Sequence, residues 1–279
     1  MARVPFETFT LRQRPDLEEQ VHRLNGESWP TFLLHGDITH WESLFDEFAD
    51  LQILFCEPAD ALISVGHTVP FVWDGTPDEL PLTMAGLMER AISAHRDHKP
   101  PNTLSAIAAL VKSSHQRRGL SAEILRTMRS LAEKRGMHSL VAPVRPTLKS
   151  SYPLTPFERY VGWRRGDGAP FDPWLRVHHR LGAECMKIMS GALAVTGTVP
   201  EWEEWTGMSF PESGPYVVPG ALQPRTDGPG TRRRPLRRPE HLDAAPGRGR
   251  RHVMIGQQTK GRIRSQARAP TCLRAPRRG

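Results

Sequence analysis

Apolar positions along residues 1–224 alternate between a strand period and a helix period. FETFTL (Phe6–Leu11) alternates apolar and polar side chains, as a half-buried strand does. Leu17, Val21 and Leu24 then recur at helical spacing after Asp16 and predict a first helix. The pattern further predicts helices over residues 39–48 and 82–95 and strands over 51–56, 61–73 and 102–111. These are followed by a helix that closes before Gly136, a strand over 139–144, a helix over 172–183 and a short helix around 202–205.

Two of these segments carry additional signals. Thr39 and Glu42 fit the T-x-x-E pattern of a helix capping box, and the apolar residues around them recur at i, i+3, i+4 and i+7. The strand over residues 102–111 is almost continuously apolar, which is typical of a central strand covered on both faces. We therefore expect a regular helix over residues 39–48 and a central strand that ends at Val111.

Charge divides the chain near residue 224. Residues 225–279 hold 15 Arg and one Lys against three acidic residues, a net charge of +13. Residues 1–224 hold 22 basic and 27 acidic residues, a net charge of −5. The tail lacks aromatic residues and a sustained apolar period, so it buries too little apolar surface to offset its ordering entropy. We expect a folded domain over residues 1–224 and a disordered basic tail, rich in Arg, Pro and Gly, over residues 225–279.

The tail has two competing interpretations. As a native arm it could bind RNA, DNA or anionic lipid, and nucleic-acid binding is expected only through it. Read one nucleotide later, the codons after Pro224 are compatible with VRMDRE, one ambiguous residue and DDGLYVDPNIWMRH, which looks like ordinary folded protein. Under this second hypothesis a one-base insertion near Pro224 makes the tail a frameshift product, and resequencing the gene across that codon decides between the two.

Several classes of protein are disfavoured by composition. The chain has no apolar run long enough to cross a membrane and no secretory signal pattern at its N-terminus, so we expect a cytoplasmic protein without membrane attachment. The cysteines Cys56, Cys185 and Cys272 lie far apart and lack metal-ligand spacing. His95 and His98 have no third ligand nearby in sequence. Neither a disulfide framework nor a metal site is predicted.

A loop with two arginines and a glycine lies between the apolar strand and the amphipathic helix of residues 111–136. The first turn of a helix has unpaired N–H groups and a positive dipole end, which together bind anions. Gly119 would let a phosphate approach the backbone without a Cβ in the way, and Arg117 and Arg118 could add charged contacts. The loop fits a diphosphate; the alternative is a solvated basic turn that caps an ordinary helix.

This loop resembles the Q/R-x-x-G-x-G/A signature of the GNAT superfamily, the acyl-CoA-dependent N-acyltransferases. The residues that carry the resemblance are Gln116, Arg117, Arg118, Gly119, Leu120, Ser121 and Ala122. Ser121 stands where Gly or Ala is usual, but it is also small. Val111 matches the family's valine at the end of the strand beside pantetheine, and the order of predicted elements agrees over most of residues 1–224. No Walker lysine follows the glycine, which argues against a P-loop NTPase.

The resemblance implies an α/β (α+β) fold with a mixed, mostly antiparallel sheet flanked by helices. It also implies acyl transfer from acetyl-CoA or another acyl-CoA, as co-substrate, to a small-molecule or peptide amine, without a metal. Catalysis would then come mainly from proximity and orientation. The residues expected to bind the co-substrate are Val111, Gln116, Arg117, Arg118, Gly119, Ser121 and Ala122. The alternative is a non-catalytic CoA-binding or partner-binding module on the same fold.

One histidine is a catalytic candidate by the same resemblance. His178 stands four residues before Gly182, where GNAT enzymes usually carry a tyrosine that protonates the departing CoA thiolate. An imidazole could serve as this general acid because its unperturbed pKa lies near neutrality. The simpler interpretation is that His178 and His179 are surface or hydrogen-bonded helix residues.

The segment of residues 198–222 is rich in aromatic side chains. Trp202 and Trp205 are three residues apart, so a helix would place both indoles on one side, where they could wall an acceptor pocket or form a contact in a homodimer. Core packing of two large apolar rings is the simpler interpretation. YVV, at residues 216–218, could add a late strand to the sheet. Three glutamates could accept the amine's proton or form a solvated face: Glu201, Glu203 and Glu204.

Overall fold

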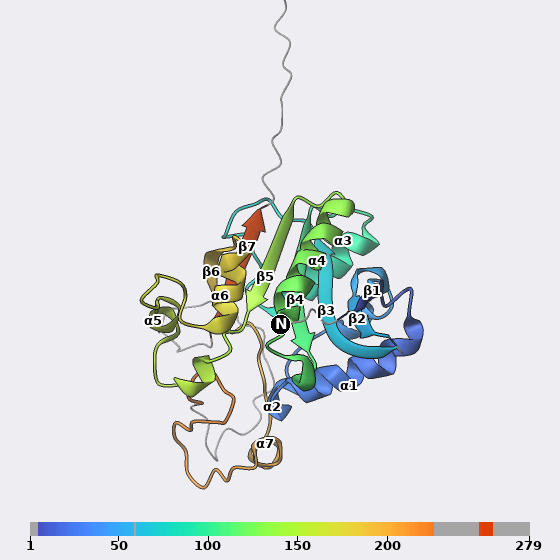
Figure 1. Ribbon diagram of the computed structural model, residues 1–279. Helices are drawn as coiled ribbons and strands as arrows, with labels where there is room; N and C mark the ends of the chain where they lie inside the picture. Colours follow the sequence, from blue (N-terminus) through green and yellow to red (C-terminus); the bar gives the residue numbers. More distant parts are fainter. Residues whose placement is uncertain (1–4, 59, 226–250, 259–279) are drawn as a thin grey trace, which may run out of the picture.

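A single seven-stranded sheet organises the computed structural model, which describes residues 5–58, 60–225 and 251–258 (Figure 1). The strand order is β1-β2-β3-β4-β5-β7-β6. Strands β4 and β5 pair in parallel, and the other neighbours pair antiparallel, so the expected mixed, mostly antiparallel sheet is confirmed. The strands are β1 (Glu7–Thr10), β2 (Ile53–Glu57), β3 (Ala61–Phe71), β4 (Thr103–Val111), β5 (Ser139–Val144), β6 (Glu184–Ser190) and β7 (Arg251–Gln258).

Helices cover both faces of the sheet. Gly66 of β3 faces α4, whereas its neighbour His67 faces α1, because successive residues of a strand point to opposite faces. Helix α3 lies on the α1 side, where its Glu89 pairs with His40. The helices are α1 (Glu18–Ser28), α2 (Thr31–Leu34), α3 (Met84–Arg96), α4 (Leu120–Lys134), α5 (Phe157–Val161), α6 (Pro173–Arg180) and α7 (Val199–Thr206). None of the helices in the described ranges is long and apolar enough to cross a membrane.

A second, smaller core lies beneath the sheet, where α2 and α7 contact each other (Figure 1). Its buried members are Phe32, Val195, Trp202, Phe210 and Val218. Helix α7 begins with the capping box Thr198–Glu201 and ends at Gly207 in the left-handed region. This second core therefore fixes residues 195–222 against the N-terminal helices, at the end of the molecule where the sheet opens.

The helix predicted over residues 39–48 is wrong. A single 3₁₀ turn, Trp41–Leu44, lies in the segment, and a second, Ala49–Leu51, follows it. The Thr39 hydroxyl donates to Asp37 instead of capping a helix, and His40 adopts a left-handed conformation with φ 64°. The helix-like apolar spacing instead reflects a loop that buries Leu44, Phe45 and Phe48.

The C-terminal part of the sheet also differs from expectation. Residues 216–218 form no sheet strand, since Tyr216 only bridges Arg225. Strand β7 instead arises within the tail that was expected to be disordered, because β5 and β6 each offer an edge of unpaired backbone groups that it can satisfy. For residues 226–250 and 259–279 the expected disorder lies outside the described residues, and the domain boundary at residue 224 stays a prediction.

Close packing of α4 on β3 depends on one glycine. A Cβ at Gly66 would lie 2.6 Å from Met128 Cε and 2.9 Å from Ile124 Cγ1, both on the buried face of α4. These separations are shorter than van der Waals contact. Any other residue at position 66 would therefore force the side chains of Met128 and Ile124 to move from their packed positions.

We predict that Gly66→Val lowers the free energy of unfolding by about 1–3 kcal/mol, the usual cost of overpacking a core. Valine is a better strand former than glycine, so a loss of stability isolates the clash with α4. The matched control is Gly26→Ala within α1, where nothing lies within 4 Å of an added Cβ and stability should rise by about 0.5–1 kcal/mol. Urea unfolding measures both; a Gly66→Val protein as stable as the parent would contradict the packing.

Candidate functional site

The sheet opens between its two parallel strands. Residues 103–105 of β4 pair with residues 139–141 of β5, and no further pairs follow, although the strands continue to Val111 and Val144. Beyond this point β4 stays paired with β3, and β5 stays paired with β7. Each diverging strand therefore keeps one hydrogen-bonded neighbour and turns its other edge toward a gap.

A bulge in β4 lies beside this gap. The register between β3 and β4 shifts so that His67 pairs with Ala108 and Thr68 with Ala106, which leaves Ile107 without a partner. A bulge bends its strand and re-aims the local side chains and backbone groups. Ile107 and Ala108 accordingly line the cavity that fills the gap.

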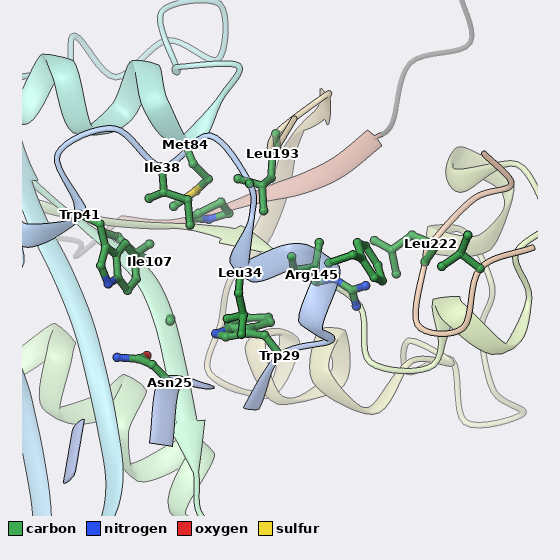
Figure 2. Close-up of a pocket in the computed structure, with 18 of the residues that line it drawn as sticks. Asn25, Trp29, Leu34, Ile38, Trp41, Met84, Ile107, Arg145, Leu193 and Leu222 are labelled. Atoms are coloured by element: carbon green, nitrogen blue, oxygen red, sulfur yellow. The ribbon is translucent and has the colours of Figure 1, made fainter. Parts of the chain in front are cut away.

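The cavity has a volume of about 410 Å³ and is mainly apolar. Figure 2 shows it extending from Asn25 and Trp41 at one side to Arg145 and Leu222 at the other. One wall comes from α1, α2 and the loop after them, a second from the diverging strands, and a third from residues 192–225. The volume suits a small molecule, and such sites are typically apolar with a few polar groups that orient the ligand.

Among the described residues, three charged side chains line the cavity: Glu42, Arg145 and Arg225. Arg225 lies 3.6 Å from the centroid of the Trp202 ring and donates to the Val195 carbonyl at 3.3 Å. Glu42 is exposed and is the second residue of the 3₁₀ turn that begins at Trp41. The cavity therefore combines apolar walls with one carboxylate and two guanidinium groups from separate parts of the chain.

Arg145 directly follows β5, and its guanidinium is largely buried. One terminal nitrogen donates to the Gly220 carbonyl, whereas Nε has no hydrogen-bond partner among the described residues. Burial lowers the pKa of this group to about 10, so it stays charged at neutral pH. The contact with Gly220 also ties the end of β5 to the third wall of the cavity.

The fully buried side chain of Lys149 also holds this third wall of the cavity in place. Its Nζ donates to the carbonyls of Leu222 and, at 2.8 Å, Tyr152, and lies 5.8 Å from the centroid of the Tyr160 ring. Burial lowers the pKa of the Lys149 ammonium to about 8. Tyr160 in turn donates to Asp172, which caps α6. Residues 220–222 are thus held by two buried cations through their backbone.

A polar network behind the cavity fixes the orientation of Asn25. The Gln52 amide donates to the carbonyls of Phe48 and Thr68 at 2.8 and 2.9 Å, so its oxygen must face Nδ1 of His67, which then carries the proton. Burial lowers the pKa of His67 to about 3, so the ring is neutral and Nε2 is an acceptor. The Asn25 amide nitrogen is therefore the group that belongs 3.1 Å from Nε2, and its oxygen becomes the atom left without a protein partner.

The loop predicted to hold a diphosphate lies at the end of β4 and before α4. Gly119 is the N-cap of α4 with φ 83°, and no side chain caps the helix. Arg117 is also left-handed, with φ 63°. Within the described ranges, the backbone N–H groups from Arg117 to Ser121 have no hydrogen-bond acceptor. They form the concave set of donors that anions favour at a helix N-terminus.

Contacts around this loop hold it in place. The Gln116 amide donates to the Val111 carbonyl at 3.4 Å, which closes the loop onto the end of β4. His115 contacts Glu57 of β2 at 3.0 Å, and Ser114 contacts the other ring nitrogen at 2.8 Å. An added Cβ at Gly119 would meet nothing within 4 Å, so the space above the loop is open. The predicted cofactor-binding residues therefore lie in succession from the end of β4, through the loop, to the first turn of α4.

His178 lies elsewhere, on α6. Its side chain is 3% exposed and packs edge-on against Trp174 at 4.4 Å between ring centroids. Burial lowers its pKa to about 4, which leaves the imidazole neutral at pH 7, and Nε2 has no partner among the described residues. His178 does not line the cavity. Its catalytic role stays a prediction.

The other predicted candidates divide between core and cavity. Trp202 is buried in the second core and also lines the cavity, whereas Trp205 stacks on His35 at 4.1 Å. Of the glutamates, Glu201 completes the capping box of α7 and Glu203 accepts from the Phe210 N–H at 3.0 Å. None of the three predicted glutamates lines the cavity.

Sequence reasoning missed the polar side chains of the described residues that line the cavity: Asn25, Glu42, Arg145, Gln223 and Arg225. No motif marks them as a site, because they come from separate segments, and Glu42 was assigned only to a helix cap. An arginine directly after an apolar strand was the only local signal for Arg145.

Comparison with known proteins identifies a relative and two similar folds. An arginine N-acetyltransferase, avaD of Aspergillus versicolor, is 30% identical over 223 residues, which cover 71% of this chain and 75% of the relative. The loading GNATL domain of CurA from Lyngbya majuscula superposes with a TM-score of 0.59 at 14% identity, covering 91% of this chain and 98% of that domain. The GNAT-like decarboxylase GphF in complex with isobutyryl-CoA gives 0.52 at 18% identity, covering 67% and 90%. No family model matches the chain.

The two solved structures share the fold, and the relative shares sequence over more than two thirds of each chain. Together with the opened β4–β5 pair, they agree with the resemblance carried by the loop of residues 116–122. The chain belongs to the GNAT superfamily, and it is an N-acyltransferase that moves an acyl group from acyl-CoA to an amine.

Proposed function

We propose that the chain acylates a small amine bound in the cavity, with arginine or a related amine as the first candidate acceptor. The observation that carries the proposal is the opening between β4 and β5, which joins the loop of residues 116–122 to the cavity along one strand. The relative from Aspergillus versicolor is an arginine N-acetyltransferase, which supports this class of acceptor.

In this arrangement the loop anchors the CoA diphosphate. The free N–H groups from Arg117 to Ser121 would donate to the phosphate oxygens, and each such bond to a charged group contributes about 1.5–3 kcal/mol. Arg117 and Arg118 are exposed beside them and add positive charge. Gln116 stabilises the loop through the Val111 carbonyl, and the small residues Ser121 and Ala122 keep the first turn of α4 open to the phosphates.

From the loop, the pantetheine arm would follow the free edge of β4. Beyond residue 105 this edge has lost β5 as its neighbour, so backbone groups of alternate residues are available to the amides of the arm. The path from Val111 back to the bulge at Ile107 leads into the cavity. The thioester would thus arrive next to the amine, which is the condition for catalysis by proximity and orientation.

Two proton transfers accompany the acyl transfer. The amine must lose a proton as it attacks the thioester carbon, and Glu42 is the carboxylate among the described residues that line the cavity. The departing thiolate gains a proton, for which the GNAT resemblance nominates His178. Burial lowers the pKa of that imidazole to about 4, so it is neutral at pH 7 before the reaction.

The decisive experiment is a thiol-release assay with acetyl-CoA, longer acyl-CoA donors and a panel of amines that includes arginine. Release of free CoA that depends on the amine, with a matching acylated product by mass spectrometry, is expected. Tight CoA binding by calorimetry without turnover on any amine would instead favour a binding module on the same fold.

Replacing Gly119 with alanine should weaken CoA binding about tenfold or more, since a Cβ at this position crowds the phosphates and φ 83° is unfavourable for alanine. Gly136 is the matched control, because it also has a positive φ, of 73°, and open surroundings, but lies at the far end of α4. Gly136→Ala should lose similar stability and keep its CoA affinity. Equal CoA affinities for the two variants would refute the diphosphate site.

A His178→Gln variant tests the proton donor. If His178 protonates the thiolate, kcat should fall about 100-fold, the lower end of the range for general acids, while the KM for acyl-CoA stays unchanged. The steady-state kinetics should be compared with those of His179→Gln, its neighbour on α6. An unchanged kcat in both variants would make His178 a packing residue.

A further inference from the structure

The guanidinium of Arg145 has more donors than the described residues use. A guanidinium carries five N–H groups in a rigid plane, and one terminal nitrogen of Arg145 contacts the Gly220 carbonyl. Nε is buried without a partner in the described part of the chain. A buried donor that stays unpaired is unfavourable, so this edge of the guanidinium is suited to a ligand that supplies acceptors.

The charge of Arg145 also has no counter-charge among the described residues. None of its ion pairs or hydrogen bonds within the described ranges involves a carboxylate, and burial alone accounts for the lowering of its pKa. Lys149 provides the contrast, since two carbonyls and the Tyr160 ring surround its ammonium and it does not line the cavity. Of these two buried cations, only Arg145 lines the cavity and has an N–H group without an acceptor among the described residues.

The surroundings favour an anion with two oxygens. A carboxylate binds a guanidinium edge through two parallel N–H···O bonds, and such bonds are stronger where apolar walls exclude water. Arg225 lines the same cavity and adds a second positive charge. The side of the cavity away from Arg145 holds Asn25 and Trp41 (Figure 2), and the carboxylate of Glu42, the next residue along the chain, also lines the cavity.

We propose that Arg145 binds a carboxylate of the substrate in the cavity. The inference rests on the proposed use of this cavity for acyl transfer and names the chemical group that selects the substrate. The carboxylate could belong to the amine acceptor, as in an amino acid, or to the acyl group of a dicarboxylic acyl-CoA. The distribution of charge favours the acceptor, because a zwitterionic amine would place its carboxylate at Arg145 and its cationic part toward Glu42.

Binding measurements separate the two sources without requiring turnover. In the first arm, calorimetry compares arginine with agmatine, the same amine without the carboxylate, in the presence of CoA. In the second arm, it compares malonyl-CoA and succinyl-CoA with acetyl-CoA. We expect arginine to bind at least tenfold more tightly than agmatine to the parent protein, and Arg145→Met to abolish this preference while CoA affinity stays the same.

The matched control is Arg129→Met. Arg129 also donates to a backbone carbonyl, that of Leu181 at 2.6 Å, but does not line the cavity. The Arg129→Met protein should still bind arginine more tightly than agmatine. Arg145→Lys provides a second variant that retains the charge and loses the planar edge, so the preference should fall without disappearing.

Each outcome decides the proposal. A preference for the carboxylate-bearing ligand in either arm, lost in Arg145→Met and kept in Arg129→Met, supports it and identifies the source. Equal binding of both ligands by the parent protein in both arms overturns it, even if the variants fail to fold. If the Arg145→Met protein still prefers the carboxylate-bearing ligand, the proposal is overturned as well. Arg145 would then serve only to hold the Gly220 carbonyl. Amine-dependent thiol release with no carboxylate preference would retain the proposed function and reject this inference alone.

Discussion

The divergence of β4 from β5 is the constraint on which the rest of the structure depends. Buried backbone groups must be hydrogen-bonded, so a sheet can open only where both strands have other partners. Here β3 supports β4 along its whole length, and β7 supports β5 through Val144. With these two neighbours in place, three paired positions suffice to hold the parallel strands together, and beyond them the gap becomes a cavity.

The loop of residues 116–122 follows from the same arrangement. Strand β4 leads directly into it, and α4 returns across β3 at a separation set by Gly66. The N-terminus of α4 is therefore held at the mouth of the gap, and the N–H groups from Arg117 to Ser121 have no acceptor in the described ranges. The N–H groups of the loop and an apolar cavity thus lie at two ends of one strand edge, an arrangement that would suit a long substrate with a charged head and a reactive tip.

The sequence allowed the local parts of this site to be predicted, and the nonlocal parts could not be. The loop around Gly119 and the strand over residues 139–144 each depend on the local pattern of consecutive residues, and the structure has both. The helix expected over residues 39–48 failed because its apolar residues are buried by tertiary contacts within a loop. Strand β7 and the position of Arg145 depend on pairing between distant segments, which no local period encodes.

Comparing the two buried cations near the end of β5, Arg145 and Lys149, supports a role for Arg145 beyond holding the Gly220 carbonyl. Burying a charge is costly, and a protein that needed only to hold residues 220–222 could do so with a neutral donor. Lys149 offsets the cost by surrounding its ammonium with carbonyls and a ring, whereas Nε of Arg145 has no partner in the described part of the chain, and Arg145 lines the cavity. Because the same side chain ties down Gly220, a ligand carboxylate at Arg145 would also steady the wall that encloses it. Selection of the substrate and closure of its site would then depend on one residue.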